Sequence, residues 1–443
     1  MANSFKKDTL ITFGGKTLEL FFLLLVSIII ARVLGPEAKG IYSLAVLLPT
    51  LLITFTQIGV GPATVFYVGR GQHSLKKIFG AVIFFSILIS MVAISIGLII
   101  ALFFGEKLFP GVAKEYLLLA LFLIPFEIFL TFGIDILLGL QKIKKYNIVR
   151  LLQGFIFLFL ISAFLLGLHF GIKAALFSQA ISFLLASIFL FFQVKKETQG
   201  IIFSLDKNLL KDFFSYSFKV YLGNIATYLH LRVDMWMINF FLNPTAAGFY
   251  SISVALAEKI WLISQSAGTV LFPRISAQKD KKMLKKFTPI VCRNILFITF
   301  LMSLVLFLFG RWLIVLFYSP VFLKSVLPFQ ILLIGTVSIS GMRILTNDLA
   351  GRGKPIINSY IALVSVILNI ALNILLIPKI GIIGAAWATA ISYTFAFVIK
   401  FVIYARISGN KIRDVVFIKK SDFRFYKHFL IKIKNRKFTL GKN

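Results

Sequence analysis

Basic side chains inside long apolar stretches are the strongest functional candidates in this sequence, because a charge in a membrane-spanning helix costs about 3 kcal/mol or more unless it is paired or faces water. Eight basic residues are of this kind. Four fall near the predicted ends of their stretches, where a long side chain can reach the interface: Arg32, Lys219, Arg293 and Lys400. The other four are predicted to line a cavity that favours an anionic guest: Lys16, Lys259, Arg232 and Arg343. For Lys16, an ion pair with Glu19 one turn away is an equally good explanation.

The stretch 213–242 carries the longest stripe of polar residues. Six of its residues recur at helical spacing on one face: Tyr221, Asn224, Tyr228, Arg232, Met235 and Asn239. His230 and Asp234 lie four residues apart on a neighbouring face, so the two could pair. A stripe of this length is expected to face the other half of the chain or an aqueous cavity, although a bond to a neighbouring helix explains Asn239 equally well. The neutral residues predicted for the cavity lining are Asn224, Tyr228, Gln57 and Gln265.

Five carboxylates also fall within the apolar stretches, and each could carry a coupling ion. These are Glu19, Glu127, Asp135, Asp234 and Glu258. If carboxylates dominated the lining, the cavity would be acidic and would favour a cationic guest instead. The composition of the lining therefore separates these two alternatives.

Features of catalysis are missing from the sequence. It has no paired carboxylates in a polar loop, no glycine-rich nucleotide loop and no nucleophile elbow. The single cysteine, Cys292, and four scattered histidines provide no metal-ligand spacing. We therefore expect no enzyme, no catalytic residue, no metal and no cofactor, and any transport must draw on a gradient or on another subunit.

The elements that position these residues are predicted to be membrane-spanning helices. Of the 443 residues, 59% are hydrophobic and only 14% are charged, with a mean hydropathy of +0.94. A soluble protein is about 25% charged, so the composition excludes a soluble globular protein. Stretches of the roughly 20 apolar residues that a spanning helix needs occur twelve times, with ten or fourteen spans as alternative counts. The sequence predicts an all-α polytopic membrane protein.

The net charge of +32 is explained by topology. Basic residues concentrate in alternate connections, one of which carries Lys142, Lys144, Lys145 and Arg150, and in both terminal regions. This pattern predicts that both termini lie in the cytoplasm and that the chain lies in the cytoplasmic (inner) membrane. The longest break, around 195–212, divides the chain into predicted six-helix bundles at 1–200 and 201–405, followed by a basic cytoplasmic tail at 406–443. We expect this tail to contact anionic membrane lipids and do not expect a nucleic-acid partner.

An internal repeat relates the two halves. Leu34-Gly-Pro-Glu-Ala-Lys-Gly-Ile-Tyr-Ser matches Leu242-Asn-Pro-Thr-Ala-Ala-Gly-Phe-Tyr-Ser at an offset of 208, and the segment from Gly171 matches the segment from Gly381 at an offset of 210. Because each half has six predicted spans, the repeats share one orientation. Parallel repeats of this kind occur in transporters, with the substrate path between the halves.

These segments, together with Gly268-Thr-Val-Leu-Phe-Pro-Arg-Ile-Ser, resemble the Wzx-type oligosaccharide flippases of the multidrug/oligosaccharidyl-lipid/polysaccharide exporter superfamily. The resemblance implies a MATE-like fold and a flippase that moves an isoprenoid diphosphate-linked oligosaccharide by alternating access for surface polysaccharide biosynthesis. It implies membrane lipids and glycan polymerase or assembly proteins as partners. The alternatives are a multidrug cation antiporter of the same superfamily, which would need an acidic cavity, and a non-transporting membrane component of glycan assembly.

Overall fold

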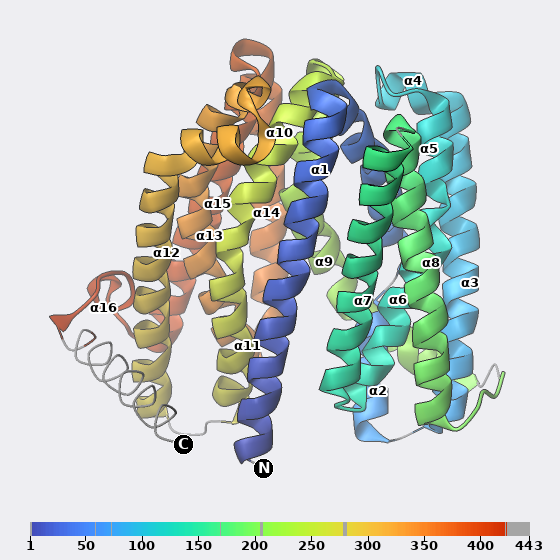
Figure 1. Ribbon diagram of the computed structural model, residues 1–443. Coiled ribbons are helices and arrows are strands. Elements are labelled where there is room, and N and C mark those ends of the chain that lie inside the picture. The colour runs from blue at the N-terminus through green and yellow to red at the C-terminus, as the bar shows by residue number, and fades with distance from the viewer. Residues whose placement is uncertain are drawn as a thin grey trace, which may run out of the picture.

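The computed structural model describes residues 2–57, 59–71, 73–168, 170–203, 207–277, 281–420 and 422. Over these ranges the chain is helical with short connections and has no strand (Figure 1). Helices satisfy all of their backbone hydrogen bonds internally, which a chain surrounded by lipid requires. The predicted all-α class is confirmed.

The first half of the chain runs from α1 to α8. Its elements are α1 (Ala2–Thr56), α2 (Val60–Arg70), α3 (Leu75–Ile99), the π-helix η1 (Ile100–Phe104), α4 (Gly105–Leu108), α5 (Lys114–Leu121), α6 (Leu123–Gly139), α7 (Ile143–Ile161), the π-helix η2 (Ser162–Gly167) and α8 (Gly171–Thr198).

The second half begins with α9 and ends with a short helix beyond the last long one. Its elements are α9 (Lys207–Phe241), α10 (Pro244–Ala257), the 3₁₀-helix η3 (Glu258–Ile260), α11 (Trp261–Ala277), α12 (Lys281–Tyr318), the 3₁₀-helix η4 (Pro320–Ser325), α13 (Val326–Gly351), α14 (Pro355–Ile380), α15 (Ile382–Ser408) and α16 (Ile412–Val416).

Ten segments within the described ranges are long and apolar enough to cross a membrane, which makes the chain a multi-pass membrane protein. The first of them, Gly14–Thr56, contains a reversal at Gly35, whose φ of 77° and ψ of −179° are not helical. Glycine tolerates this backbone at little cost, and Pro36 then starts the next limb. The 35-residue α9 is not among the ten, because its polar stripe lowers its hydropathy. The expectation of twelve spans counts the two limbs of α1 separately and includes α9.

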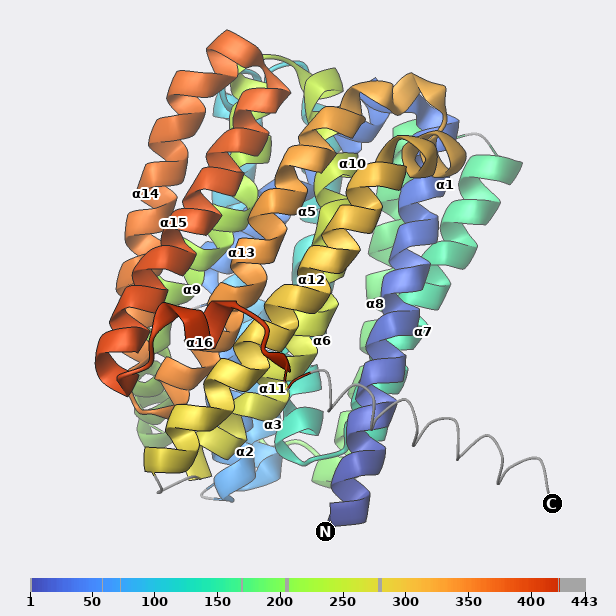
Figure 2. The same cartoon turned by 90° about the vertical axis from the view of Figure 1, so that its left-hand side faces the viewer.

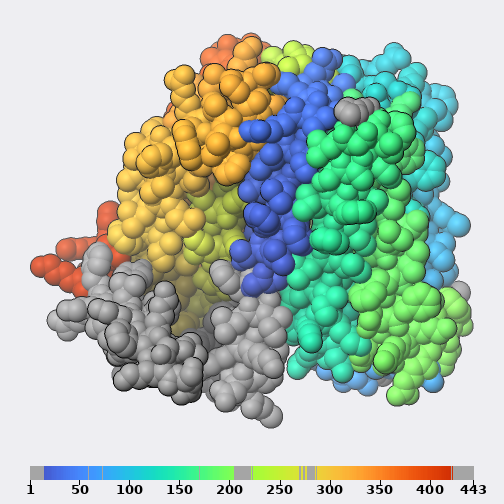
Figure 3. All heavy atoms as spheres, viewed as in Figure 1, coloured from blue at the N-terminus to red at the C-terminus, as the bar shows by residue number. Residues whose placement is uncertain are grey.

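The long helices form two groups with the first limb of α1 between them. Figure 1 shows α3–α8 on one side and α10–α15 on the other, and Figure 2 shows the second group face on. In the space-filling view the surface of α1 runs along the boundary between the groups (Figure 3). One large buried cluster includes residues of both halves, such as Leu44 and Tyr250, so the halves share a hydrophobic core. The domain boundary at residue 200 stays a prediction.

The repeated motifs pack directly against each other near the end of the molecule that carries Gly35. A Cβ atom on Gly40 would lie 1.8 Å from the carbonyl oxygen of Pro244, and one on Gly248 would lie 1.9 Å from that of Pro36. Each half therefore has a glycine whose lack of a side chain leaves room for a backbone carbonyl of the other half. The repeat found in the sequence is a reciprocal contact in three dimensions.

The segment after α15 folds back onto the second half. Val415 of α16 is fully buried against residues of α11, α12 and α15. Arg293 of α12, which the sequence placed near the interface, is buried and forms an ion pair with Asp422, with Nε 2.6 Å from Oδ2. The rest of the predicted tail, residues 423–443, lies outside the described residues.

Candidate substrate cavity and ion site

An arginine of α7 organises the predicted residues of the first half. Arg150 has its Nη1 4.0 Å from Oε1 of Glu19, and it interacts electrostatically with Lys16, Glu127 and Asp135. Its Nε is buried and has no hydrogen-bond partner within the described ranges. The sequence interpretation assigned Arg150 to a cytoplasmic connection, but the residue lies two turns inside α7. Arg150 follows Ile143 by seven residues, about two helical turns, and this distance could have identified it as a residue inside the helix.

The carboxylates of this group are half-buried and are contributed by different helices. Glu19 lies on α1, whereas Glu127 and Asp135 lie two turns apart on α6. Asp135 approaches α2 so closely that a Cβ on Gly61 would lie 2.3 Å from its Oδ2. Gln57, also half-buried, occupies the break between α1 and α2. Lys16 therefore lies near a carboxylate, Glu19, and near a second cation, Arg150. The interaction with Glu19 agrees with the alternative in which Lys16 pairs with Glu19.

The strongest ion pair of the candidate site joins α9 to η3. Arg232 donates from Nη1 to Oε1 of Glu258 at 2.5 Å and from Nη2 to Oε2 at 3.2 Å, a bidentate pair whose side chains are 33% and 21% exposed. Tyr228, one turn away, interacts with both of them and with Thr50 of α1. Lys259 is half-buried and interacts with Glu258 and with Glu19 of the first half. The predicted cation Arg232 therefore already has a counter-ion.

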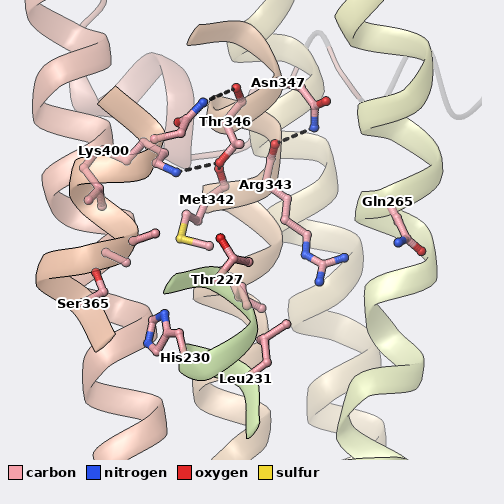
Figure 4. A pocket seen from close by; sticks show the side chains of 15 residues that line it. Thr227, His230, Leu231, Gln265, Met342, Arg343, Thr346, Asn347, Ser365 and Lys400 are labelled. Atoms are coloured by element: carbon pink, nitrogen blue, oxygen red, sulfur yellow. Dashed lines mark hydrogen bonds between the residues drawn. The ribbon is translucent and has the colours of Figure 1, made fainter. Parts of the chain in front are cut away.

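A cavity of about 400 Å³ lies among five helices of the second half. Figure 4 shows Arg343 extending from α13 towards Gln265 of α11, and Lys400 reaching from α15 to Thr346. The Arg343 guanidinium lies 4.5 Å from the ring centroid of Trp261, a cation–π contact. Lys400 is only 3% exposed and donates to Oγ1 of Thr346 at 2.7 Å. The expectation that Lys400 snorkels to the interface is wrong, because the side chain points into the protein.

Asp234 lies in a separate, buried polar cluster. Its Oδ2 accepts from the hydroxyls of Tyr250 (2.5 Å) and Thr389 (3.1 Å), and its Oδ1 accepts from the backbone N–H of Met235 (2.8 Å). Asp234 and His230 do not pair directly, contrary to the geometric suggestion in the sequence. Instead, His230 lies 2.9 Å from Oγ of Ser392.

Two asparagines of α14 extend this cluster. Asn369 donates to Ser392 at 3.2 Å and lies 3.5 Å from Thr389, while Asn373 donates to Oδ1 of Asn369 at 3.0 Å. Both asparagines are fully buried, as the close packing of α14 against α9 and α15 requires. Nothing in the sequence spacing of these asparagines connects them to Asp234, which lies on another helix. No group of three or more His, Cys, Asp or Glu residues that could hold a metal ion occurs in the part of the chain that the structure describes.

The predicted site residues thus fall into four places. The Arg150 group contains Lys16, Glu19, Glu127 and Asp135, and the Arg232–Glu258 pair has Tyr228 and Lys259 beside it. The cavity of the second half contains Arg343 and Gln265, and the buried cluster contains Asp234. Asn224 is exposed on α9 and does not line this cavity. Arg150, Lys400, Tyr250 and Thr389 are the main residues that the sequence interpretation missed.

Solved structures define the class of protein. The chain superimposes on a lipid II flippase in an inward closed conformation with a TM-score of 0.75, at 18% identity and covering 92% of this chain and 88% of that one. It superimposes on the inward-facing conformation of a multidrug-resistance MATE-family transporter with a TM-score of 0.74, at 15% identity and covering 90% and 98%. The predicted MATE-like fold is therefore confirmed.

Curated relatives and a family model then identify the family. An uncharacterised membrane protein of Methanocaldococcus jannaschii is 25% identical over 87% of this chain and 94% of its own length. A putative O-antigen transporter of Shigella flexneri is 24% identical over 81% and 87%, and a probable low-salt glycan biosynthesis flippase of Haloferax volcanii is 26% identical over 41% and 39%. The family model described as polysaccharide biosynthesis protein matches residues 5–279. The chain belongs to this family of membrane transporters and flippases.

Proposed function

We propose that this protein moves an isoprenoid diphosphate-linked oligosaccharide across the cytoplasmic membrane by alternating access and is not an enzyme. The observation that carries the proposal is the sign of the cavity charge: its described lining includes Arg343 and Lys400 and no carboxylate. Diphosphates can take charge-assisted hydrogen bonds from such groups. The names of the glycan flippase and O-antigen transporter relatives support the substrate class.

The rival antiporter function requires an acidic lining. Among the five candidate carboxylates, Glu258 is paired with Arg232, Glu19 lies near Arg150, and Asp234 is enclosed in its own cluster. Glu127 and Asp135 lie close enough to Arg150 to interact with it. Because the carboxylates are balanced by cations or enclosed, the arrangement favours the flippase over a cation antiporter.

The repeat contact supports a mechanism in which the two halves rock against each other. Both termini are proposed to be cytoplasmic, so the Gly40–Pro244 and Gly248–Pro36 contacts would lie towards the outer side of the membrane. Opening the path to the outside would then separate these two contacts together. Membrane lipids and glycan-assembly proteins are the proposed partners.

Coupling to a gradient is assigned within this proposal to Asp234. It is the one candidate carboxylate that is almost completely buried, at 3% exposed, with hydroxyl and amide groups around it and no ion-pair partner in the described chain. A buried carboxylate with these neighbours suits a proton or a small monovalent cation, whose arrival removes the cost of the isolated charge. The other four stay candidates of lower rank, because each of them is only half-buried.

The test is translocation of a fluorescent isoprenoid diphosphate-linked oligosaccharide in vesicles that contain the purified protein. Neutralising Lys16, Arg232 and Arg343 together is expected to lower the rate at least tenfold without lowering the amount of protein inserted. Because Arg232 holds Glu258, the variant also carries Glu258→Gln, which avoids leaving an unpaired carboxylate.

The matched control removes three exposed lysines, Lys107, Lys354 and Lys379, and should translocate at the normal rate. Full activity of the variant that lacks the charges of Lys16, Arg232 and Arg343 would contradict a role of these cations in translocation. If the unmodified protein moved no lipid-linked sugar at all, a non-transporting role in glycan assembly would be favoured.

A further inference from the structure

Lys400 is the most unusual charged residue of the second half. Its side chain comes from α15, eight residues before the end of that helix, and is 3% exposed. Its ammonium makes one hydrogen bond, to the neutral hydroxyl of Thr346. An ammonium has three donors, so two of them have no protein acceptor within the described ranges. A buried cation with no ion-pair partner is costly and calls for an anion beside it.

Arg343 gives the same cavity a second cation. Its guanidinium lies over the ring of Trp261. Its N–H groups donate no hydrogen bond to any described residue. Guanidinium groups present several donors in a fixed plane and suit phosphate oxygens. Lys400 and Arg343 reach the space from different helices, as Figure 4 shows.

The remaining lining can bind hydroxyls or phosphate oxygens but cannot neutralise the two cations. Thr227, Gln265 and Asn347 are neutral, and no aspartate or glutamate is among the described lining residues. The volume of about 400 Å³ falls in the range of roughly 300–1,000 Å³ that is typical of small-molecule sites. The cavity is thus a cationic site of a size that would accommodate a diphosphate.

We propose that this cavity of the second half binds the diphosphate group of the transported lipid-linked sugar, with Lys400 as its principal cation and Arg343 as the second. The proposal rests on the proposed function for the identity of the substrate, but the anion site itself does not. It moves the main anion contact away from Arg232, whose charge Glu258 already balances. Free diphosphate has the same headgroup chemistry, so the experiment compares a soluble and a lipid-linked source.

The test measures binding of inorganic pyrophosphate and of farnesyl diphosphate to the purified full-length protein by titration calorimetry, with thermal unfolding as a second readout. Lys400→Met is expected to weaken binding at least tenfold. Its unliganded form should melt no lower than the unmodified protein, because the substitution removes an unpaired buried charge.

Lys379→Met is the matched control, because this lysine is exposed on α14. Arg343→Gln provides a second variant in case Lys400→Met does not fold, and it too should weaken binding at least tenfold. Binding of farnesyl diphosphate alone would identify the lipid-linked source, and equal binding of pyrophosphate would show that the headgroup suffices.

Unchanged affinity in Lys400→Met, or in Arg343→Gln where it must stand in, would overturn the anion site, as would absence of binding of both probes to the unmodified protein. Failure of the proposed function would give a different result from failure of the anion site. A protein that binds diphosphate through Lys400 but translocates no lipid-linked sugar keeps the site and loses the flippase role. A protein that translocates normally after Lys400→Met keeps the flippase role and loses this subsite as its binding step.

Discussion

The two repeats place a tyrosine at the same position but give it different partners. In the first half, Tyr42 donates to Oε1 of Gln179 at 2.6 Å. In the second, its counterpart Tyr250 donates to Asp234 at 2.5 Å and lies 3.4 Å from Thr389, the residue that matches Gln179 at the offset of 210. The position that matches Asp234 at the offset of 208 is Val26, which is buried and apolar.

This difference makes the two copies of the repeat chemically unequal. The tyrosine and its partner across the bundle tie the second limb of α1 to α8 in one half, and α10 to α15 in the other. In the second half, the tyrosine and its partner also donate to a carboxylate, that of Asp234, and the asparagines of α14 extend this cluster. The first half provides a neutral hydrogen bond, whereas the second provides a group whose charge can change. This contrast supports the ranking of Asp234 above the first-half carboxylates in the proposed function.

The largest effect is expected from Asp234→Asn. It retains the size of the side chain but removes its charge, so translocation driven by an ion gradient should fall at least tenfold while protein levels stay normal. The matched change in the first half, Gln179→Leu, breaks only a neutral bond and should lower transport less than threefold. Transport in vesicles with imposed proton or sodium gradients measures both. Equal losses in the two variants would mean that the halves do not differ in coupling.

Glycine substitutions test whether the halves are equal where they touch. Gly40→Ala and Gly248→Ala each place a methyl group within 2 Å of a carbonyl oxygen of the other half. Overpacking of this kind costs about 1–3 kcal/mol, so both should lower the melting temperature by similar amounts. Gly14→Ala is the control, because nothing lies within 4 Å of its added Cβ. A strong effect of only one of the two would show that the contact is not reciprocal.

Removing the tyrosine hydroxyls should give unequal losses of stability. Tyr250→Phe takes one hydroxyl donor from the buried carboxylate of Asp234 and should cost about 1–3 kcal/mol in the free energy of unfolding. Tyr42→Phe takes a donor from the neutral amide of Gln179 and should cost about 0.5–1.5 kcal/mol. Thermal unfolding in detergent measures both. A larger loss for Tyr42→Phe would contradict the expected ranking of the two hydrogen bonds.

Sequence reasoning could predict the features that depend on composition and local spacing. Hydropathy was enough for the helical class, and the repeat identified Tyr42 and Tyr250 as equivalent residues. Partners across the bundle could not be predicted, because they depend on how five or more helices pack. Arg150 was read as a loop charge from its neighbours Lys144 and Lys145, and Lys400 as an interfacial one. Hydropathy reports a residue's depth only coarsely and does not report which face of the helix it occupies.

The smallest effect on transport is expected at the ion pair that holds the C-terminal segment. Here too the halves differ, since the position that matches Arg293 is the buried Phe85. Asp422 lies outside the membrane-spanning segments, and its hydrogen bonds from Arg293 lower the pKa of its carboxyl below the ordinary value. A lowered pKa means that the pair stabilises the docked segment fully above the ordinary aspartate pKa of about 3.9. The contribution is lost as the pH falls through the lower pKa of the folded protein.

Docking of α16 should therefore be insensitive to pH from 8 down to 5 and weaken only in acid below about pH 4. Hydrogen exchange of the α16 amides, corrected for intrinsic rates, measures this. Asp422→Asn should loosen α16 at every pH and remove the acid transition, with less than a twofold change in transport. Asp414→Asn is the control, because the Asp414–Lys419 pair is exposed and such pairs contribute little. If Asp422→Asn left the exchange rates unchanged, burial of Val415 alone would account for the docking of α16, and the ion pair would contribute nothing to it.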